Sequence, residues 1–389
     1  MALKVNTRVK FLEASSTLAI TARAKELRAK GFDVVNFAAG EPDFGTPQHI
    51  KDAAIKAIGE DYTKYTPSIG ALDLRQAICD KFKRENNLEY KPSQVAVSCG
   101  AKHSLFCIIQ VLTDVGEEVL IPTPYWVSYP EMVKLSGATS KFIKTSSETN
   151  FKITAKQLEN SITDKTKLLI LNSPSNPTGM IYSKEELQAI ADVCVKNNIY
   201  VISDEIYEQF VYGDDECVSI ASLGKEIYDL TITVNGVSKS AAMTGWRIGY
   251  CAANEEILGY ITKLQDHSTS CPSSISQKAA LQALSETKEY FTAMREEFKK
   301  RRDLITSAFD EVDEISYIMP QGAFYLFCDF SKLGESLEVA KNILNDVNVA
   351  MIPGDSFGSP GFMRLSFATS SERILEGTKR IKAWIKKQA

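Results

Sequence analysis

Two cations lie eight residues apart around one short loop of the sequence. Lys239 comes soon after an apolar run at 230–234, and Arg247 closes the small-residue loop that follows. A lysine amine can form a Schiff base with an aldehyde, and an arginine can hold a phosphate. Both side chains would also be ordinary as solvated loop ends, so their meaning depends on the rest of the chain.

Other chemically capable residues follow four further apolar runs. The runs at 95–99, 118–122, 167–172 and 200–203 lead, in this order, to the turn Gly100-Ala101-Lys102, to Trp126, to Asn176 and to Asp204. In an open α/β sheet, ligands bind beyond the carboxyl ends of the strands, so we expect these residues to lie together there. Taken singly, they have ordinary alternatives as turn residues, as a helix cap and as a core ring.

One chemistry accounts for the whole set. A lysine for an aldehyde, a ring to stack on a flat heterocycle, a carboxylate for a ring nitrogen, and a glycine turn with an arginine for a phosphate together suit pyridoxal 5'-phosphate. The aldehyde and the phosphate arm of this cofactor leave neighbouring ring atoms. One short loop that carries both Lys239 and Arg247 could therefore serve both groups.

The elements that must position these residues alternate along the chain. Short β-branched runs are separated by amphipathic helical patterns, for instance at 184–198, which predicts an α/β fold with a mostly parallel central sheet. Later, a long charged helical pattern at 288–312 is followed by short strands and a terminal helix, which predicts a smaller α+β lobe. A chain of 389 residues exceeds the usual size of a single core, so we expect two lobes around a shared cleft.

Composition and charge narrow the class of protein. The formal net charge of -4 offers no basic field for nucleic acid or anionic lipid. The eight cysteines are scattered singly, which suits a reducing cytoplasm, and the three histidines show no paired spacing for a catalytic zinc. The segment 1–16 lacks a signal-peptide core, and no apolar run reaches the roughly 18 residues of a membrane helix. We predict a cytoplasmic protein without a metal, a membrane partner or a nucleic-acid partner.

Seven motifs together resemble one known family. The sequence is similar to the class I aminotransferases of fold type I, and within them to the bacterial aspartate aminotransferase branch that includes prephenate aminotransferases. The similarity covers essentially the whole chain and rests on AAGEPDF (38–44), KYTPSIGALDLRQAI (64–78), PYWVSYPEM (124–132), NSPSNPTG (172–179), SDEIYE (203–208), NGVSKSAAMTGWRIGY (235–250) and FMRLSFATS (362–370). We accordingly expect a large cofactor-binding domain at 47–284 and a small domain, formed by 1–46 and 285–389, that closes over the active site.

The resemblance implies a role for each residue around pyridoxal phosphate. Lys239 matches the Schiff-base lysine, which becomes the general base once an amino acid substrate displaces it. Asp204 matches the carboxylate on the pyridine nitrogen, and Trp126 matches the stacking ring. Asn176 and Tyr207 match the donors to the phenolic oxygen. Lys239, Asp204 and Tyr207 are the predicted catalytic residues.

The remaining matches concern the phosphate and the substrate. Arg247, the turn 100–102 and Tyr65 of the partner subunit match the phosphate site, which implies a homodimer with shared active sites. Arg364 matches the bidentate clamp on the substrate α-carboxylate. The other predicted substrate contacts are Gly40, Trp126, Asn176 and Lys102.

Two places depart from the wider family pattern. Gly236 stands where some members have a phosphate-binding serine, so Ser238 or the backbone must compensate. The stretch 265–274 holds no arginine, although some relatives supply one there for the distal substrate carboxylate. We expect Lys102 to meet that carboxylate instead, so a strict preference for dicarboxylates is not implied.

The predicted reaction moves the amino group of L-aspartate, or of a similar amino acid, to 2-oxoglutarate by a ping-pong mechanism, giving oxaloacetate and glutamate. A prephenate or aromatic amino acid aminotransferase, or a β-lyase on the same scaffold, is the alternative. A transcriptional regulator is disfavoured because the recognisable fold begins near residue 17 and the charge is acidic. A nicotinamide dehydrogenase is disfavoured because no G-x-G-x-x-G motif follows a predicted strand.

Overall fold

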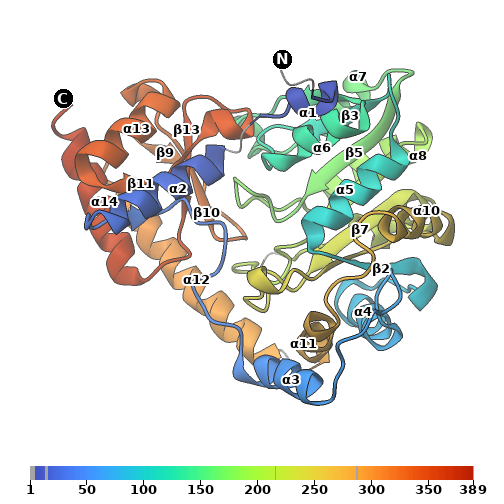
Figure 1. The fold of residues 1–389 in the computed structure, drawn as a ribbon. Coiled ribbons are helices and arrows are strands. Elements are labelled where there is room, and N and C mark those ends of the chain that lie inside the picture. Colours follow the sequence, from blue (N-terminus) through green and yellow to red (C-terminus); the bar gives the residue numbers. More distant parts are fainter. Residues whose placement is uncertain (1–4, 14–15, 215, 286–287, 389) are drawn as a thin grey trace.

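A seven-stranded sheet forms the centre of the larger part of the molecule (Figure 1). The computed structural model describes residues 5–13, 16–214, 216–285 and 288–388. In spatial order, the strands of this sheet are β2 (Val95–Ser98), β8 (Gly249–Ala252), β7 (Thr231–Gly236), β6 (Tyr200–Asp204), β5 (Thr166–Asn172), β3 (Glu118–Pro122) and β4 (Thr139–Ile143). Strand β8 runs antiparallel to both neighbours and the other pairs are parallel, so the predicted mostly parallel sheet is confirmed.

Both faces of this sheet are covered by helices. Along β5, Leu168 and Ile170 belong to one core and Leu169 and Leu171 to the core on the opposite face. The first face packs against α5 (Ala101–Leu112), α6 (Ser128–Ser136) and α10 (Glu255–Asp266). The other packs against α7 (Ala155–Ser161), α8 (Lys184–Lys196) and α9 (Lys225–Leu230), and near β2 against α3 (Gln48–Gly59), α4 (Leu72–Asn86) and α11 (Ser274–Ser285). Strands β3, β5 and β6 are buried on both faces and carry continuous apolar runs, whereas the edge strand β4 is partly exposed and more polar.

Helix α8 shows how local sequence signals set an element. The Ser183 hydroxyl accepts a hydrogen bond from the Glu186 backbone N–H at 3.2 Å, and the Glu186 carboxylate accepts one from the Ser183 N–H at 2.7 Å. This reciprocal capping box satisfies two backbone donors of the first turn. The predicted helix at 184–198 is confirmed, and it ends slightly earlier than predicted.

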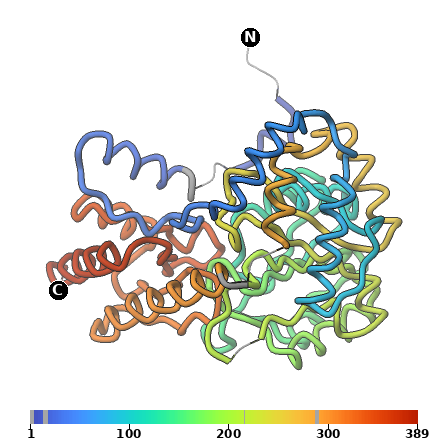
Figure 2. The backbone as a smooth tube through the Cα atoms, turned by 90° about the horizontal axis from the view of Figure 1, so that it is seen from below, coloured from blue at the N-terminus to red at the C-terminus, as the bar shows by residue number. Residues whose placement is uncertain are grey.

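The second lobe is built from both ends of the described chain. Its antiparallel sheet has the order β12 (Ile352–Pro353), β13 (Phe362–Ser366), β10 (Tyr325–Asp329) and β9 (Ser316–Tyr317), and its helices are α2 (Ser16–Ala29), α12 (Lys288–Phe309), α13 (Ser336–Val347) and α14 (Ser371–Ile385). Strand β1 (Val35–Asn36) pairs in parallel with β11 (Val349–Ala350), so early and late segments lie side by side (Figure 2). The predicted late helix at 288–312 is α12. The exact domain boundaries at 46/47 and 284/285 stay a prediction.

Two further features bear on the site. The short helix α1 (Thr7–Lys10) lies against α6, where the Arg8 guanidinium donates to the Leu135 carbonyl at 3.3 Å. At the carboxyl edge of the large sheet, Asn172 of β5 is paired with Asp204 of β6, and β7 ends beside them at Gly236. The strand ends therefore deliver their polar residues to one edge, as predicted.

No helix in the described ranges is long and apolar enough to cross a membrane.

Candidate active site

A cavity of about 320 Å³ opens at the carboxyl edge of the large sheet. Side chains of β10 and β13 close it from the second lobe, namely Tyr325 and Arg364. The predicted site residues that line it are Gly40, Ala101, Lys102, Trp126, Asn176, Asp204, Tyr207, Lys239, Arg247 and Arg364. Gly100 precedes Ala101 as the cap residue of α5. The structure thus brings together residues that are more than 300 positions apart in the sequence.

Lys239 lies just beyond β7 with its amine buried. Its Nζ donates to the Gly40 carbonyl oxygen at 2.7 Å. Burial lowers the pKa of Lys239 to about 8; the nearby cations Arg247, Arg364 and Lys102 act in the same direction, whereas Glu41 opposes them. About a tenth of this amine is therefore neutral at pH 7, far more than for an ordinary lysine, and the neutral form is the nucleophile and proton acceptor.

Asp204 is the last residue of β6 and is 4% exposed. The Tyr129 hydroxyl donates to Asp204 Oδ2 at 2.7 Å, and the Ile206 backbone N–H donates to Oδ1 at 3.3 Å. Burial raises the pKa of Asp204 to about 6, and these two hydrogen bonds act against the rise. Residues 206–209 form a turn and not a helix, so the helix-cap interpretation of Asp204 is wrong.

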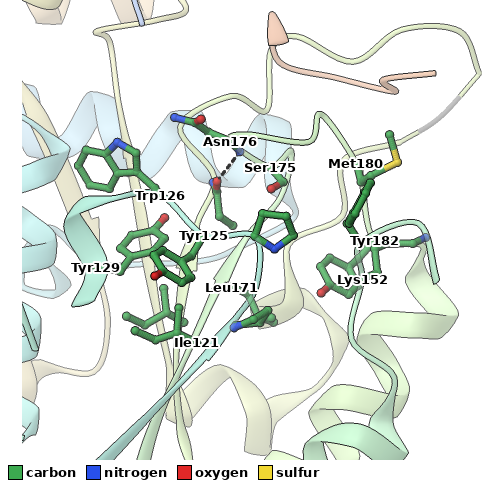
Figure 3. A pocket seen from close by; sticks show the side chains of 15 residues that line it. Ile121, Tyr125, Trp126, Tyr129, Lys152, Leu171, Ser175, Asn176, Met180 and Tyr182 are labelled. Atoms are coloured by element: carbon green, nitrogen blue, oxygen red, sulfur yellow. Dashed lines mark hydrogen bonds between the residues drawn. The ribbon is translucent and has the colours of Figure 1, made fainter. Parts of the chain in front are cut away.

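Asn176 and Trp126 form one wall of the cavity. The Asn176 backbone N–H donates to Asn172 Oδ1 at 2.8 Å, and its side-chain Oδ1 accepts from Arg364 Nη1 at 3.0 Å. Figure 3 shows Trp126, Tyr129 and Asn176 around a neighbouring pocket of about 30 Å³, which shares these residues with the main cavity. The Trp126 ring meets Tyr129 edge-on at 5.4 Å, and Lys102 Nζ lies 4.8 Å from the centre of the indole.

The cationic end of the cavity depends on a glycine. Gly100 has φ +86°, which favours glycine, and a Cβ there would lie 2.3 Å from Arg247 Nη2, so a larger residue would displace this guanidinium. Arg247 donates to the Thr244 carbonyl at 2.7 Å and to the Cys99 carbonyl at 3.4 Å. The N-terminus of α5 lies beside it and presents backbone N–H groups. Guanidinium and helix N-terminus together suit a phosphate.

The two departures from the family pattern have a structural setting. A Cβ on Gly236 would lie 3.0 Å from Gly249 Cα and 3.1 Å from the Ile248 carbonyl, so β7 and β8 pack too closely there for an easy serine. Ser238 lines the cavity, which leaves it available for the compensating contact. None of the residues 265–274, all of which are described, lines the cavity, whereas Lys102 does.

Arg364 is a second cation that lines the cavity, and unlike Arg247 it is buried. Its Nη1 donates to Asn176 Oδ1 and its Nη2 to the Ala38 carbonyl, both at 3.0 Å. Its Nε is buried without a hydrogen-bond partner among the described residues. A buried guanidinium with an unmatched donor is costly unless an anion completes it, so this guanidinium suits a carboxylate.

The donor set fits pyridoxal 5'-phosphate. A close approach of Arg247 to the backbone lies at Gly100, and the same cavity is lined by the buried carboxylate of Asp204 and by the amine of Lys239, whose pKa is lowered. A protonated ring nitrogen beside Asp204 would stabilise the ionised carboxylate and so oppose burial, which raises the pKa of this carboxyl.

The structure places one predicted residue apart and adds two that the sequence interpretation did not assign. Tyr65 lies between α3 and α4 with 91% of its surface exposed, and it does not line the cavity. Tyr129 and Tyr325 both line the cavity. Trp126 precedes α6, and the Tyr129 backbone N–H donates to its carbonyl at 3.0 Å, so one turn brings both side chains to the cavity. Nothing in the run 323–330 singled out Tyr325 from its aromatic neighbours.

Comparison with known proteins gives a consistent result over nearly the whole chain. Residues 33–381 match the family described as aminotransferase class I and II. A protein named aspartate aminotransferase from Bacillus sp. (strain YM-2) is 50% identical and covers 97% of this chain and 98% of its own length. One named probable aspartate/prephenate aminotransferase from Aquifex aeolicus is 47% identical over 97% of both chains.

A solved structure agrees with these sequence matches. Aspartate aminotransferase from Thermus thermophilus with maleate superposes with a TM-score of 0.95 at 38% identity, covering 98% of this chain and 99% of that one. These matches confirm the predicted fold class, the amino-transfer chemistry and the dependence on pyridoxal phosphate. The chain belongs to the family of class I and II aminotransferases.

Proposed function

We propose that this aminotransferase moves the amino group of L-aspartate to 2-oxoglutarate, giving oxaloacetate and glutamate in two half-reactions. One observation carries the proposal: Arg364 and Lys102 both face the cavity that holds Lys239. A substrate with two carboxylates needs two cations, and its reacting carbon must lie near the lysine amine. The names of the relatives from Bacillus sp. and Thermus thermophilus support the same substrate.

The chain's own residues have separate tasks in this reaction. Lys239, Asp204, Asn176, Tyr207, Trp126, Arg247 and the start of α5 would hold pyridoxal phosphate. When bound, this cofactor supplies an electron sink for the pair left on the substrate Cα. The neutral Nζ of Lys239 accepts the proton from Cα. The carboxylate of Asp204, held by the Tyr129 hydroxyl, keeps an opposing ring nitrogen protonated.

Substrate recognition would be divided between two cations of different geometry. The planar guanidinium of Arg364 suits a bidentate pair with the α-carboxylate that every amino acid carries. The amine of Lys102 suits a distal carboxylate, since a compact charge needs no fixed orientation. Prephenate also carries carboxylates, and the relative from Aquifex aeolicus is named for both activities, so prephenate is the second candidate.

We also propose a homodimer, with Tyr65 reaching the phosphate site of the partner. Ile55, Ile58, Tyr65 and Leu72 are exposed apolar residues in and after α3. A second copy would cover these residues, and Tyr65, which is 91% exposed, would then contact the phosphate site of that copy. Around each site, the segment 47–284 would form the large domain and 1–46 with 285–389 the small domain. We propose a cytoplasmic location for this homodimer.

The proposal is tested by separated half-reactions of the cofactor-loaded enzyme. The absorbance of the bound cofactor is followed with each candidate amino acid and then with each 2-oxo acid. We expect aspartate and glutamate to discharge it fastest, and oxaloacetate and 2-oxoglutarate to restore it. Faster discharge by aromatic amino acids would overturn the aspartate assignment, whereas pyruvate release from a cysteine conjugate would indicate the β-lyase.

A further inference from the structure

Tyr325 stands where the two lobes meet and contacts several parts of the site at once. It is fully buried on β10, and its hydroxyl lies 3.0 Å from the Tyr207 hydroxyl. The Arg364 guanidinium lies 4.4 Å from the centre of its ring. A Cβ built on Gly40 would lie 3.6 Å from the Tyr325 hydroxyl, so this hydroxyl also borders the residue whose carbonyl accepts from Lys239.

We propose that Tyr325 is a positioning residue with two separable tasks: its ring face holds the carboxylate-binding guanidinium of Arg364, and its hydroxyl sets the proton of Tyr207. The proposal rests on the proposed function, because it assigns the α-carboxylate to Arg364 and the cofactor contact to Tyr207.

The first task follows from the sheet register. Arg364 of β13 pairs with Phe327 of β10, and Tyr325 lies two residues from Phe327, so Tyr325 and Arg364 are diagonal neighbours on one face. Both Nη atoms of Arg364 have protein acceptors, but its Nε has none among the described residues. Besides the two Nη hydrogen bonds, the guanidinium is held by the aromatic faces of Tyr325 and of Phe357, whose ring centre lies 5.2 Å away. A cation over such a face is attracted by the ring.

The second task follows from counting protons. Burial raises the pKa of both Tyr207 and Tyr325, so both hydroxyls carry their protons. Two hydroxyls in contact hold two protons, and only one is used between them. When Tyr325 donates, the Tyr207 proton is free to point into the cavity toward an acceptor on the cofactor. Without the Tyr325 hydroxyl, no hydrogen bond from that residue holds the Tyr207 proton toward the cavity.

Two substitutions separate the tasks. Tyr325→Phe keeps the ring under Arg364 and removes the hydroxyl, whereas Tyr325→Leu removes both. Tyr90→Phe is the matched control, because it loses a buried hydroxyl that contacts Thr233 at 3.2 Å outside the cavity. For each cofactor-loaded variant we would measure the pH titration of the cofactor absorbance and the Kd of maleate, a dicarboxylate that carries no amino group to transfer.

The expected results differ between the variants. Tyr325→Phe should raise the midpoint of the absorbance titration by about 0.5–1 pH unit, because a lost donor destabilises the form with more charge on the cofactor oxygen. Its maleate Kd should stay within about twofold of wild type. Tyr325→Leu should show the same titration shift and a maleate Kd weaker by about 3- to 10-fold. Tyr90→Phe should change neither quantity.

Several outcomes would overturn the inference. They are an unshifted titration midpoint in Tyr325→Phe, an unchanged maleate Kd in Tyr325→Leu, or a titration shift in Tyr90→Phe as large as that in Tyr325→Phe. Should Tyr325→Leu not fold, Tyr325→Phe alone still decides the hydroxyl task, and Phe357→Leu tests the aromatic support of Arg364 from its other neighbour. Wild-type enzyme that binds cofactor and maleate but moves no amino group from aspartate would refute the proposed function and leave these binding results standing.

Discussion

Asp204 and Glu205 are consecutive, buried acidic residues that belong to two different clusters. Asp204 lines the cavity with Tyr129 and Lys239, which we call the cavity cluster. Glu205 belongs to the helix α4 cluster, formed by Lys81, Asn86, Glu205 and Glu208 with the hydroxyls of Ser203 and Ser219. The same turn of chain thus supplies both clusters.

The two clusters differ in what their polar groups face. Lys81 forms an ion pair with Glu208 and donates to Asn86 Oδ1 at 2.6 Å. Glu205 Oε1 accepts from Ser203 at 2.7 Å and from Ser219 at 2.6 Å. In the cavity cluster, by contrast, Lys239 and Asp204 line open volume.

Burial and pKa do not separate the clusters. Burial raises the pKa of Asp204 to about 6 and, aided by the charge of Glu208, that of Glu205 to about 7. A shifted carboxyl is therefore a weak sign of catalysis in this molecule. The difference that points to function is open space beside the group, and the following variants test that distinction.

The largest contrast should come from Lys239 and Lys81, the lysines of the two clusters. Lys239→Ala should lose transamination by about 10³-fold or more while remaining folded, because the variant lacks the amine that takes the Cα proton. Lys81→Met should unfold more easily by about 3–5 kcal/mol, because it leaves Glu208 as a buried unpaired charge, yet keep its turnover per folded molecule. Single-turnover rates measure the loss of transamination, and denaturant titrations measure the free energy of unfolding. An active Lys239→Ala or an inactive, stable Lys81→Met would reverse the assignment of the clusters.

The neighbouring carboxylates should differ nearly as much. Asp204→Asn should slow Cα-proton removal by about 10²-fold or more with a smaller loss of cofactor affinity, because a neutral amide favours an unprotonated ring nitrogen, a poorer electron sink. Glu205→Gln should keep turnover within a fewfold. Deuterium exchange at the substrate Cα and the cofactor Kd separate chemistry from binding. Near-normal exchange in Asp204→Asn would leave that residue with a structural task alone.

These pairs also show what the sequence could and could not predict. Strand-end residues such as Asp204 and Lys239 were predictable, because parallel strands end at a common edge and a known family shares the motif. Glu205 looked equally suitable one position later, and only the direction of its side chain excludes it. Tyr325 was not predictable, because its contacts with Tyr207 and Arg364 depend on how the two lobes meet.

Arg364 should show what a fixed orientation adds to a charge. Arg364→Lys keeps the cation but loses the planar fork, so the catalytic efficiency should fall by about 2–4 kcal/mol for every substrate alike. The efficiencies for aspartate, glutamate and phenylalanine would be measured side by side. A loss confined to the dicarboxylates would place the distal, not the α-carboxylate, at this arginine.

Glu205 should reveal itself in the pH dependence of stability. Its pKa is about 7 in the folded protein against the ordinary 4.5, so the folded state holds this proton more tightly than the unfolded chain. The resulting stability is complete below pH 4.5 and is lost as the pH rises to about 7. Glu205→Gln removes the ionisation, so its free energy of unfolding relative to wild type should rise by about 3 kcal/mol across that window and then level off. A pH-independent difference in denaturant titrations would contradict the assignment.

The smallest effect is expected at Lys102, a cation that lines the cavity and forms no ion pair with a carboxylate of the described residues. Its amine lies over the Trp126 ring, and burial lowers its pKa, with Arg247 acting in the same direction. Lys102→Ala should reduce the ratio of catalytic efficiencies for aspartate over phenylalanine by about 3- to 10-fold, because an apolar side chain never uses that charge. Saturating cofactor removes any loss that comes from a weaker phosphate contact.

Lys167 is the control for this last comparison, because its amine lies 5.5 Å from the centre of the Tyr200 ring but outside the cavity. Lys167→Ala removes a cation of the same kind, so the aspartate to phenylalanine ratio should stay at its wild-type value. A ratio that is unchanged in Lys102→Ala as well would remove the distal-carboxylate task from Lys102 and leave it with the phosphate or with Trp126. Position beside the open cavity, and not the lysine–aromatic contact that both residues make, is what the two variants together isolate.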